Sequence, residues 1–234
     1  MKRTFAGLTC GIWLGLGLVQ AAWAESAVVV ELYTSQGCSS CPPADAFLAT
    51  LLNDPGVIPL ALHVDYWDYI GWKDSFGNPK FTDRQRAYAH VEGSKTIYTP
   101  QMIVGGSDRA VGNDEATIKQ AIRNHQEASS PVSLHLTRTG AKVTIYASSS
   151  EVFAQPLRVQ LVRYLPQETV EIGRGENAGL TMTYHNIVTA WSTVVKWNGK
   201  TDLTVDADVA GPEAVVVIVQ EDGPGMIYAA EVMH

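Results

Sequence analysis

A Cys-x-x-Cys pair between an apolar run and a helical pattern constrains this chain more than any other feature. Residues 28–46 read VVVELYTSQGCSSCPPADA, the pattern of an apolar strand, a short Ser/Gly turn and the start of a helix. Cys38 and Cys41 stand at that helix start, so their thiols face the same side and can close a small disulfide ring. A helix N-terminus stabilises a thiolate through its partial positive charge and unpaired N–H groups. The stretch therefore predicts a redox-active site.

The N-terminus has the three parts of a secretory signal peptide. Lys2 and Arg3 form a basic start, residues 5–19 form an uncharged apolar run, and Ala22–Ala24 is a small-x-small cleavage pattern. The apolar run is shorter than the ~20 residues of a membrane-spanning helix, which argues against an anchor. We expect residues 1–24 to be removed and the mature protein to be periplasmic or secreted, with no membrane segment after cleavage.

Charge and cysteine content narrow the function classes. The full chain has a formal charge of −7, and loss of Lys2 and Arg3 makes the mature chain more acidic. A nucleic-acid partner requires a basic surface, so we expect none. One of the three cysteines, Cys10, lies in the predicted leader. An export signal together with one remaining close cysteine pair indicates an oxidising compartment.

The first half of the mature chain, residues 25–127, alternates strand and helix patterns. A strand, a helix long enough to cross over and a second strand predict a parallel pair. The elements expected from apolar spacing are strands at 27–33, 57–64, 101–104 and 108–111, and helices at 44–52 and 115–126.

An aromatic-rich insertion at 65–93 interrupts this pattern, with a helical segment at 82–90 that Thr82 or Asp83 would cap. The insertion either lies near the active face or forms a satellite cluster that only packs, since aromatic side chains are core-formers first. Both interpretations stay open at this point.

The composition changes after a linker at 128–131. Residues 132–234 alternate apolar and polar side chains over six or seven short runs, which is typical of an antiparallel β-sandwich. The exception is the Gly-rich, polar stretch Gly173–Asn186. It is a solvated loop, a loop docked onto the redox domain, or a recognition site, and the sequence leaves these alternatives open.

The element order, with Cys-x-x-Cys after the first strand and Thr99-Pro100 before the third, resembles the thioredoxin fold. In that family the proline is cis and lies against the cysteine pair, so the resemblance implies a cis Pro100. We therefore expect an α/β thioredoxin-like domain at 25–127, a mixed sheet with flanking helices, followed by an antiparallel β-sandwich domain at 132–234.

Longer motifs resemble one family more closely, the secreted bacterial proteins known as DUF1223, whose function is unknown. The motifs are ELYTSQGCSSCPPAD at 31–45, HVDYWDYIGWKD at 63–74, YTPQMIVGG at 98–106 and, more weakly, GRGENAG at 173–179 with His185-Asn186. The resemblance implies a thioredoxin-like fold and leaves the activity open.

The thioredoxin resemblance assigns roles within the cysteine pair. It implies that Cys38 is the exposed, attacking thiol and that Cys41, one turn inside, is the resolving thiol. Ser39 and Ser40 lie between them, and their hydroxyl and N–H groups can donate hydrogen bonds to a Cys38 thiolate.

The segment around Pro100 is the expected substrate groove. Pro100 would shape the groove and keep metal ions away from the thiolates. Thr99 and Gln101 would offer backbone hydrogen bonds to an extended peptide, in the manner of strand addition. We therefore expect Thr99, Gln101, Ser39 and Ser40 to bind substrate.

Glu31 interrupts an otherwise apolar strand before the cysteine pair. A buried carboxylate is costly unless it is paired or protonated. In thioredoxins a buried acid on the corresponding strand takes the proton of the inner cysteine, and the resemblance implies this role for Glu31, although the spacing to Cys38 is one residue longer. The alternative is a carboxylate paired with a nearby Lys, Arg or Tyr.

Three functions remain open. The first is an exported thiol–disulfide oxidoreductase that acts on protein or peptide substrates with a redox partner protein and needs no cofactor beyond the Cys38–Cys41 disulfide. The second is a non-catalytic binding module with a structural disulfide, although so short a loop gains little stability from closure. The third is copper or zinc handling through Cys38, Cys41 and His63. The spacing of His63 is not specific, so no metal ligand is assigned.

Overall fold

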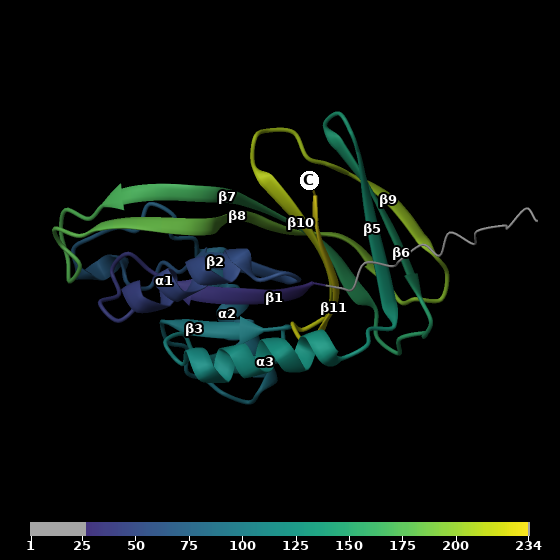
Figure 1. Cartoon of the computed structure of the whole chain (residues 1–234), viewed down its shortest axis with the longest axis horizontal. Coiled ribbons are helices and arrows are strands. Elements are labelled where there is room, and N and C mark those ends of the chain that lie inside the picture. The colour runs from purple at the N-terminus through teal and green to yellow at the C-terminus, as the bar shows by residue number, and fades with distance from the viewer. Residues whose placement is uncertain (1–26, 234) are drawn as a thin grey trace, which may run out of the picture.

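The protein is described here by a computed structural model that covers residues 27–233. The predicted signal peptide at 1–24 lies outside the described residues. The structure has a mixed α/β fold with an eight-stranded mixed sheet and a separate three-stranded antiparallel sheet (Figure 1). This confirms the mixed α/β class. Among the described helices, none has the length and apolar character that a membrane crossing needs.

The larger sheet joins strands from both halves of the chain, in the order β11-β10-β7-β8-β2-β1-β3-β4. β1 and β2 are parallel, and β2 also meets β8 in parallel at Ala61 and Ile187. The strands are β1 (Val28–Thr34), β2 (Val57–His63), β3 (Gln101–Val104), β4 (Asp108–Val111), β7 (Leu157–Glu171), β8 (Thr181–Trp197), β10 (Ala214–Glu221) and β11 (Ile227–Met233).

The smaller sheet consists of β5 (Val132–Thr139), β6 (Lys142–Ser149) and β9 (Leu203–Asp208). An apolar core lies between it and the β7, β10 and β11 part of the larger sheet, with Val143, Ile145, Val217 and Val219 fully buried. β7 and β8 run the length of the molecule, from this end to the end where α1 begins (Figure 1).

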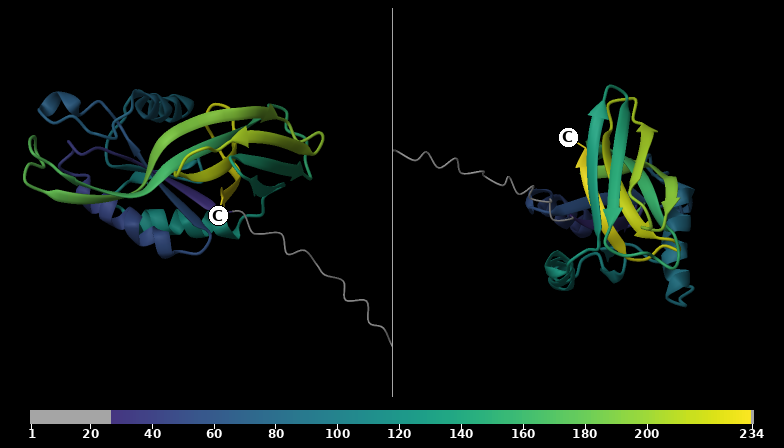
Figure 2. Two further views of the ribbon diagram at one scale, coloured as in Figure 1. Left: turned by 90° about the horizontal axis from the view of Figure 1, so that it is seen from above. Right: turned by 90° about the vertical axis from the view of Figure 1, so that its right-hand side faces the viewer.

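Helices cover both faces of the first-half strands. α1 (Pro42–Thr50), which continues into the 3₁₀ turn Leu51–Asn53, and α3 (Glu115–Glu127) lie on one face, and α2 (Pro79–Val91) lies on the other (Figure 2). Successive residues of β1 point to opposite faces. Val28, Val30 and Leu32 therefore pack with α1 and α3, whereas Val29 and Tyr33 pack on the α2 side.

Two predicted element boundaries are wrong for local reasons. α2 begins at Pro79 rather than Thr82, because the side chain of Asn78 caps it by accepting a 3.0 Å hydrogen bond from the Lys80 N–H. β8 begins at Thr181, inside the stretch expected to be loop, because Thr181 pairs with Glu171 of β7. The predicted linker 128–131 lies between α3 and β5, and the strands on its two sides share the larger sheet.

Candidate functional site

The cysteine pair forms the N-terminus of α1. The sulfurs of Cys38 and Cys41 lie at disulfide-bond distance, and their Cα atoms are 5.4 Å apart. Cys41 is the N-cap residue, and its carbonyl accepts the first helical hydrogen bonds, from the N–H groups of Ala44 and Asp45. The predicted strand, turn and helix are therefore in place around the pair.

Both cysteines are covered, which corrects the expectation that Cys38 is exposed. Cys38 is 2% exposed and Cys41 is 0% exposed. Ser39 and Ser40 are the exposed residues of the motif. The physical reason is that two segments from elsewhere in the chain pack around the turn before the cysteines, one from the β7–β8 connection and one from the insertion at 65–93.

The first covering segment is the tip of the β7–β8 hairpin. The side-chain amide of Asn177 donates hydrogen bonds to the carbonyls of Gln36, at 2.9 Å, and Cys38, at 3.0 Å. The tip is closed by backbone bonds from Ile172 to Leu180 and from Gly179 to Ile172. Among the interpretations that the sequence left open for this Gly-rich stretch, the structure shows a segment docked onto the first half of the chain.

The second covering segment is the aromatic insertion. The Trp72 indole donates a 2.8 Å hydrogen bond to the Gln36 side chain, and the Trp67 indole donates a 2.7 Å bond to the Thr99 hydroxyl. A Cβ atom added at Gly37 would lie 3.3 Å from Trp67 and from Ile70, so these side chains pack closely on the turn before Cys38. The insertion therefore lies beside the cysteine pair, and the indoles of Trp67 and Trp72 are fixed by hydrogen bonds.

Pro100 lies beside α1, and the Thr99–Pro100 peptide bond is cis, as expected. A Cβ atom added at Gly112 would lie 2.8 Å from Pro100 and 3.0 Å from Ala44, so proline, glycine and helix pack together. The next residue, Asn113, donates a 3.1 Å hydrogen bond from its side chain to the Ser40 carbonyl. These contacts bring the proline segment to the cysteine turn.

The side chains on either side of Pro100, those of Thr99 and Gln101, already take part in hydrogen bonds within the protein. The Thr99 hydroxyl accepts the Trp67 bond, and the Gln101 side chain accepts a 2.8 Å bond from Gln85. Gln101 is 8% exposed and its strand, β3, has neighbours on both sides. The structure therefore presents no free strand edge at Gln101, and its predicted substrate role stays a prediction.

The structure does not bring Glu31 to the cysteine pair. Its side chain lies on the α2 face of the sheet, and α1 lies on the opposite face. Both Glu31 oxygens accept 2.7 Å hydrogen bonds from the Arg84 guanidinium, and further bonds come from the hydroxyls of Tyr33, at 2.9 Å, and Tyr88, at 2.7 Å. Glu31 is therefore the paired carboxylate of the alternative interpretation. Burial, together with the nearby Glu31 carboxylate, raises the pKa of Tyr33 and of Tyr88.

A different buried acid lies close to the cysteines. Asp45 is on α1, one turn after Cys41, and is 5% exposed. Its Oδ2 accepts a 3.0 Å hydrogen bond from Thr34, whereas Oδ1 is buried without a hydrogen-bond partner among the described residues. Burial raises the pKa of Asp45 to about 7, against the opposing influence of His63 and Thr34. The spacing of four residues from Cys41 is the sequence signal that would have identified it.

His63 and Asp74 form a buried pair behind Asp45. His63 Nδ1 lies 2.8 Å from Asp74 Oδ2, and both residues are almost fully buried. Burial would raise the pKa of Asp74, but the charge and hydrogen bond of His63 outweigh it, and the pKa falls below its usual value. The His63 ring meets Phe76 and Tyr184 edge-on, and its Nε2 is buried without a partner among the described residues.

The three ligands considered for a metal site do not assemble. Within residues 27–233, no group of three or more His, Cys, Asp and Glu side chains is placed to hold a metal ion. His63 directs Nδ1 to Asp74 instead.

Comparison with known protein families identifies the family of this chain. The model of a family described as a protein of unknown function, DUF1223, matches residues 29–220. The chain belongs to the DUF1223 family. The resemblance inferred from the sequence is therefore confirmed. No curated protein matches this DUF1223 chain.

Two solved structures are similar to the DUF1223 chain. A crystal structure of a protein from Agrobacterium tumefaciens is 30% identical, with a TM-score of 0.76 over 89% of this chain and 95% of that one. HBP35 of Porphyromonas gingivalis is 17% identical, with a TM-score of 0.63 over 89% of this chain and 75% of that one, a likeness of fold alone.

The DUF1223 motifs meet at the cysteine turn. Gln36 from the first motif binds Trp72 and, through its N–H at 2.8 Å, Asp74 from the second. Thr99 from the third motif holds Trp67, and Asn177 from the fourth caps the carbonyls of Gln36 and Cys38. Segments far apart in the sequence therefore build one site around the disulfide.

Proposed function

We propose that this DUF1223 chain is an exported thiol–disulfide oxidoreductase, with a thioredoxin-like first half that acts through Cys38 and Cys41. The observation that carries the proposal is the cysteine pair at the N-terminus of α1, with the Pro100 segment packed against the same helix. A helix N-terminus lowers the pKa of a thiol and makes it a better leaving group. The mature protein would work in the periplasm or outside the cell, on protein or peptide substrates and with a redox partner protein.

The exchange proceeds in two balanced steps. The reduced Cys38 thiolate attacks one sulfur of a substrate disulfide, forms a mixed disulfide and releases the other sulfur as a thiolate that takes up a proton. Cys41 then loses its proton and attacks Cys38, which forms the Cys38–Cys41 disulfide and releases the second substrate sulfur. Two electrons pass from the protein to the substrate. The reverse sequence oxidises a substrate dithiol.

In this proposal Asp45 replaces Glu31 as the acceptor of the Cys41 proton. Helical spacing places Asp45 and Cys41 on one side of α1. A carboxyl group with a pKa of about 7 can accept and return a proton near neutral pH. Glu31 is paired with Arg84 on the other face of the sheet from α1, so the proposal does not use it as the acceptor.

Access to the disulfide requires movement of the Asn177 segment, because Cys38 is 2% exposed. Two side-chain hydrogen bonds from this segment to carbonyls, each worth about 1 kcal/mol, would have to break. We propose that a substrate displaces these bonds as it binds.

Burial of both cysteines also favours a second candidate function, a binding module whose disulfide is permanent. The reduction potential of the Cys38–Cys41 pair separates the two. We expect a value between about −270 and −120 mV, the range of working oxidoreductases, measured by equilibration of the mature protein against glutathione or dithiothreitol. A value well below about −300 mV would overturn the oxidoreductase proposal and support the structural disulfide.

A further inference from the structure

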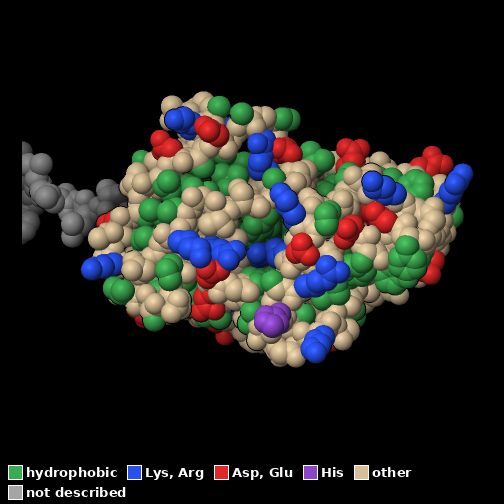
Figure 3. Space-filling model, turned by 180° about the vertical axis from the view of Figure 1, so that it is seen from behind, with side chains coloured by type: hydrophobic (Ala, Val, Ile, Leu, Met, Phe, Trp, Pro, Cys, Tyr) green, Lys and Arg blue, Asp and Glu red, His purple; other side chains and the backbone are tan. Residues whose placement is uncertain are grey.

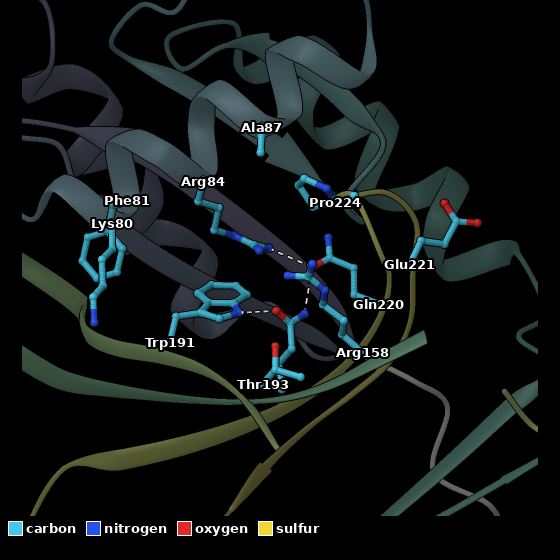
Figure 4. Close-up of a pocket in the computed structure, with 12 residues that line it drawn as sticks. Lys80, Phe81, Arg84, Ala87, Arg158, Trp191, Thr193, Gln220, Glu221 and Pro224 are labelled. Carbon is cyan, nitrogen blue, oxygen red and sulfur yellow. Dashed lines mark hydrogen bonds between the residues drawn. The ribbon is translucent and has the colours of Figure 1, made fainter. Parts of the chain in front are cut away.

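The buried polar side chains on the two faces of the larger sheet differ in how completely they are hydrogen-bonded. On the α2 face, the Trp191 indole donates a 2.8 Å bond to Gln160, which donates a 2.9 Å bond to Gln220 (Figure 4). Arg84 donates a 3.0 Å bond to the same Gln220 oxygen. None of these four side chains has a buried polar atom without a partner within residues 27–233. The surface of this side carries side chains of both charges close together (Figure 3). The network is therefore complete without a ligand.

Two buried polar atoms on the α1 face lack partners. They are Asp45 Oδ1 and His63 Nε2, and the other such atoms within residues 27–233 belong to arginines that form ion pairs. The two side chains are neighbours across Thr34. The Thr34 hydroxyl donates a 3.0 Å bond to the Asp45 carboxylate, and Thr34 is the register partner of His63, so both project to the same face. A native fold leaves few buried polar groups unpaired, and each one calls for an explanation.

Two acids connect His63 to the two ends of the cysteine motif. Asp74 Oδ2 lies 2.8 Å from His63 Nδ1 and accepts a 2.8 Å bond from the N–H of Gln36, in the turn before the cysteines. At the other end, the Asp45 N–H donates a 3.1 Å bond to the Cys41 carbonyl. The imidazole therefore lies between two acids, each bonded to one end of the motif.

The protonation of the His63 ring follows from Asp74. Burial acts to raise the pKa of Asp74, but the charge and hydrogen bond of His63, with N–H bonds from Gln36 and Phe76, hold it below its usual value. Asp74 is therefore ionised and can only accept hydrogen bonds. His63 Nδ1 carries a hydrogen and donates it, so Nε2 is the atom at which the ring gains or loses its second proton.

Few other charged groups act on the His63 ring. No Lys or Arg within residues 27–233 forms an ion pair with Asp45 or Asp74, so His63 is the group that can supply a positive charge to both. The remaining titratable side chain against the ring is Tyr184 of β8, whose ring centre lies 4.8 Å away. Burial and the two acids raise the pKa of Tyr184, so its hydroxyl stays protonated. Reduction of the cysteine pair is the event that adds negative charge to this region.

We propose that His63 is a positioning residue of the redox pair, whose imidazole binds a proton more tightly when Cys38 and Cys41 are reduced than when they form the disulfide. It acts through Asp45 and Asp74, which are bonded to the two ends of the motif. A nearby thiolate favours the imidazolium form, because an opposite charge stabilises a charged group. This role rests on the proposed oxidoreductase function and supplies a proton that the exchange needs.

The coupling completes the proton balance of the exchange. The reduced protein holds a Cys38 thiolate, a Cys41 thiol and a His63 imidazolium. Oxidation of the pair passes two electrons to a substrate disulfide, whose S–S bond breaks as the bond between Cys38 and Cys41 forms. The two sulfurs that are released take up two protons. One comes from Cys41 through Asp45 and the other from His63 Nε2, so the charge of the protein interior is the same before and after the exchange.

The test follows the imidazole signals of the isotope-labelled mature protein by NMR across the pH range in which histidine titrates, first oxidised and then reduced with a phosphine. We expect the His63 midpoint to lie about one pH unit higher in the reduced protein, which is about tenfold tighter proton binding. His125 is the internal control, because it also meets an aspartate, at 2.7 Å from Asp108. It lies in the last turn of α3, whose other end meets the cysteine turn through Asn113, so its midpoint should not move.

Linkage requires a reciprocal effect on the cysteines. As the pH falls through the His63 midpoints, the equilibrium constant for reduction of the pair should rise about tenfold more in the wild type than in His63→Gln, about 30 mV in the potential. His125→Gln should keep the wild-type profile. Equal His63 midpoints in the two states, or a His63→Gln profile parallel to that of the wild type, would rule the coupling out. The imidazole titration needs no variant and reads the chemically reduced protein whatever its potential, so its failure is distinguishable from failure of the oxidoreductase proposal.

Discussion

The side-chain amide of Asn177 lies 3.0 Å from the backbone carbonyl of Cys38, although the two residues are 139 positions apart in the chain. A second bond from the same amide reaches the Gln36 carbonyl at 2.9 Å. The turn before the cysteine pair is therefore covered in part by the far end of the β7–β8 hairpin.

Asn177→Ala should accelerate reduction of the disulfide by dithiothreitol. Loss of two hydrogen bonds, together about 2 kcal/mol, raises the population of the open segment and hence the rate about 30-fold. The rate is followed by trapping free thiols at intervals. Glu176→Ala, which changes the exposed neighbouring residue, serves as the control. Equal rates in both variants and the wild type would mean that the hairpin tip does not limit access.

Asp45→Asn should change how stability depends on pH. The folded-state pKa of Asp45 is raised from 3.8 to about 7, so the fold favours its protonated form. This contribution to stability is present below about pH 4 and is lost as the pH rises through 7. Asp45→Asn should therefore gain on the wild type by up to about 4 kcal/mol between pH 4 and pH 8, measured by urea unfolding.

The control for this pH series is Asp83→Asn, whose side chain is 73% exposed. Its unfolding free energy should follow the wild type across the range. A parallel profile for Asp45→Asn would show that Asp45 has an ordinary pKa and would remove it as the proton acceptor of Cys41.

Glu31→Gln should destabilise the protein without changing the cysteine chemistry. Removal of one charge from the buried Glu31–Arg84 pair leaves the other uncompensated, at a cost of about 3–5 kcal/mol in the free energy of unfolding. Glu115→Gln, which breaks the exposed pair with Lys119, should cost less than about 1 kcal/mol. A large shift in the reduction potential of Glu31→Gln would instead restore Glu31 as the proton acceptor.

Substitution of Asn186, which links β8 to β2, should lower the free energy of unfolding. It has a positive φ of 45° and donates a 2.8 Å hydrogen bond to the Pro59 carbonyl of β2. Asn186→Ala loses the bond and strains the backbone, at about 2 kcal/mol in total. Asn186→Gly loses only the bond, so its unfolding free energy should lie between those of the wild type and Asn186→Ala. Equal stability of the glycine and alanine variants would show that the φ angle is unimportant.

The strand, turn and helix around the cysteine pair could be predicted because each follows from a short sequence pattern. The apolar run, the Ser/Gly turn and the prolines after Cys41 specify the strand, turn and helix within one stretch of chain. The pairing of Ala61 with Ile187 could not be predicted, because no local pattern in β2 or β8 marks the partner. For the same reason the start of β8 at Thr181 was missed, since its pairing with β7 outweighs the polar composition.

In the candidate site, too, local motifs could be predicted and contacts between distant segments could not. Cys38, Cys41 and Pro100 are set by motifs. The burial of Cys38 depends on Asn177, whose position follows from the path of a long hairpin. For Glu31 the sequence left two interpretations open, and it could not identify the partner because Arg84 lies 53 positions away.

The shared sheet has a consequence for how this chain can be divided. A fragment ending at residue 127 would turn β2, VIPLALH, into an unprotected outer strand, and would strip the cover from Tyr33, Leu60 and Leu62, which pack against Val162, Val188 and Val216. Such an apolar margin recruits other chains. Because the two halves share one sheet and one core, we expect that neither half stays soluble when it is produced without the other.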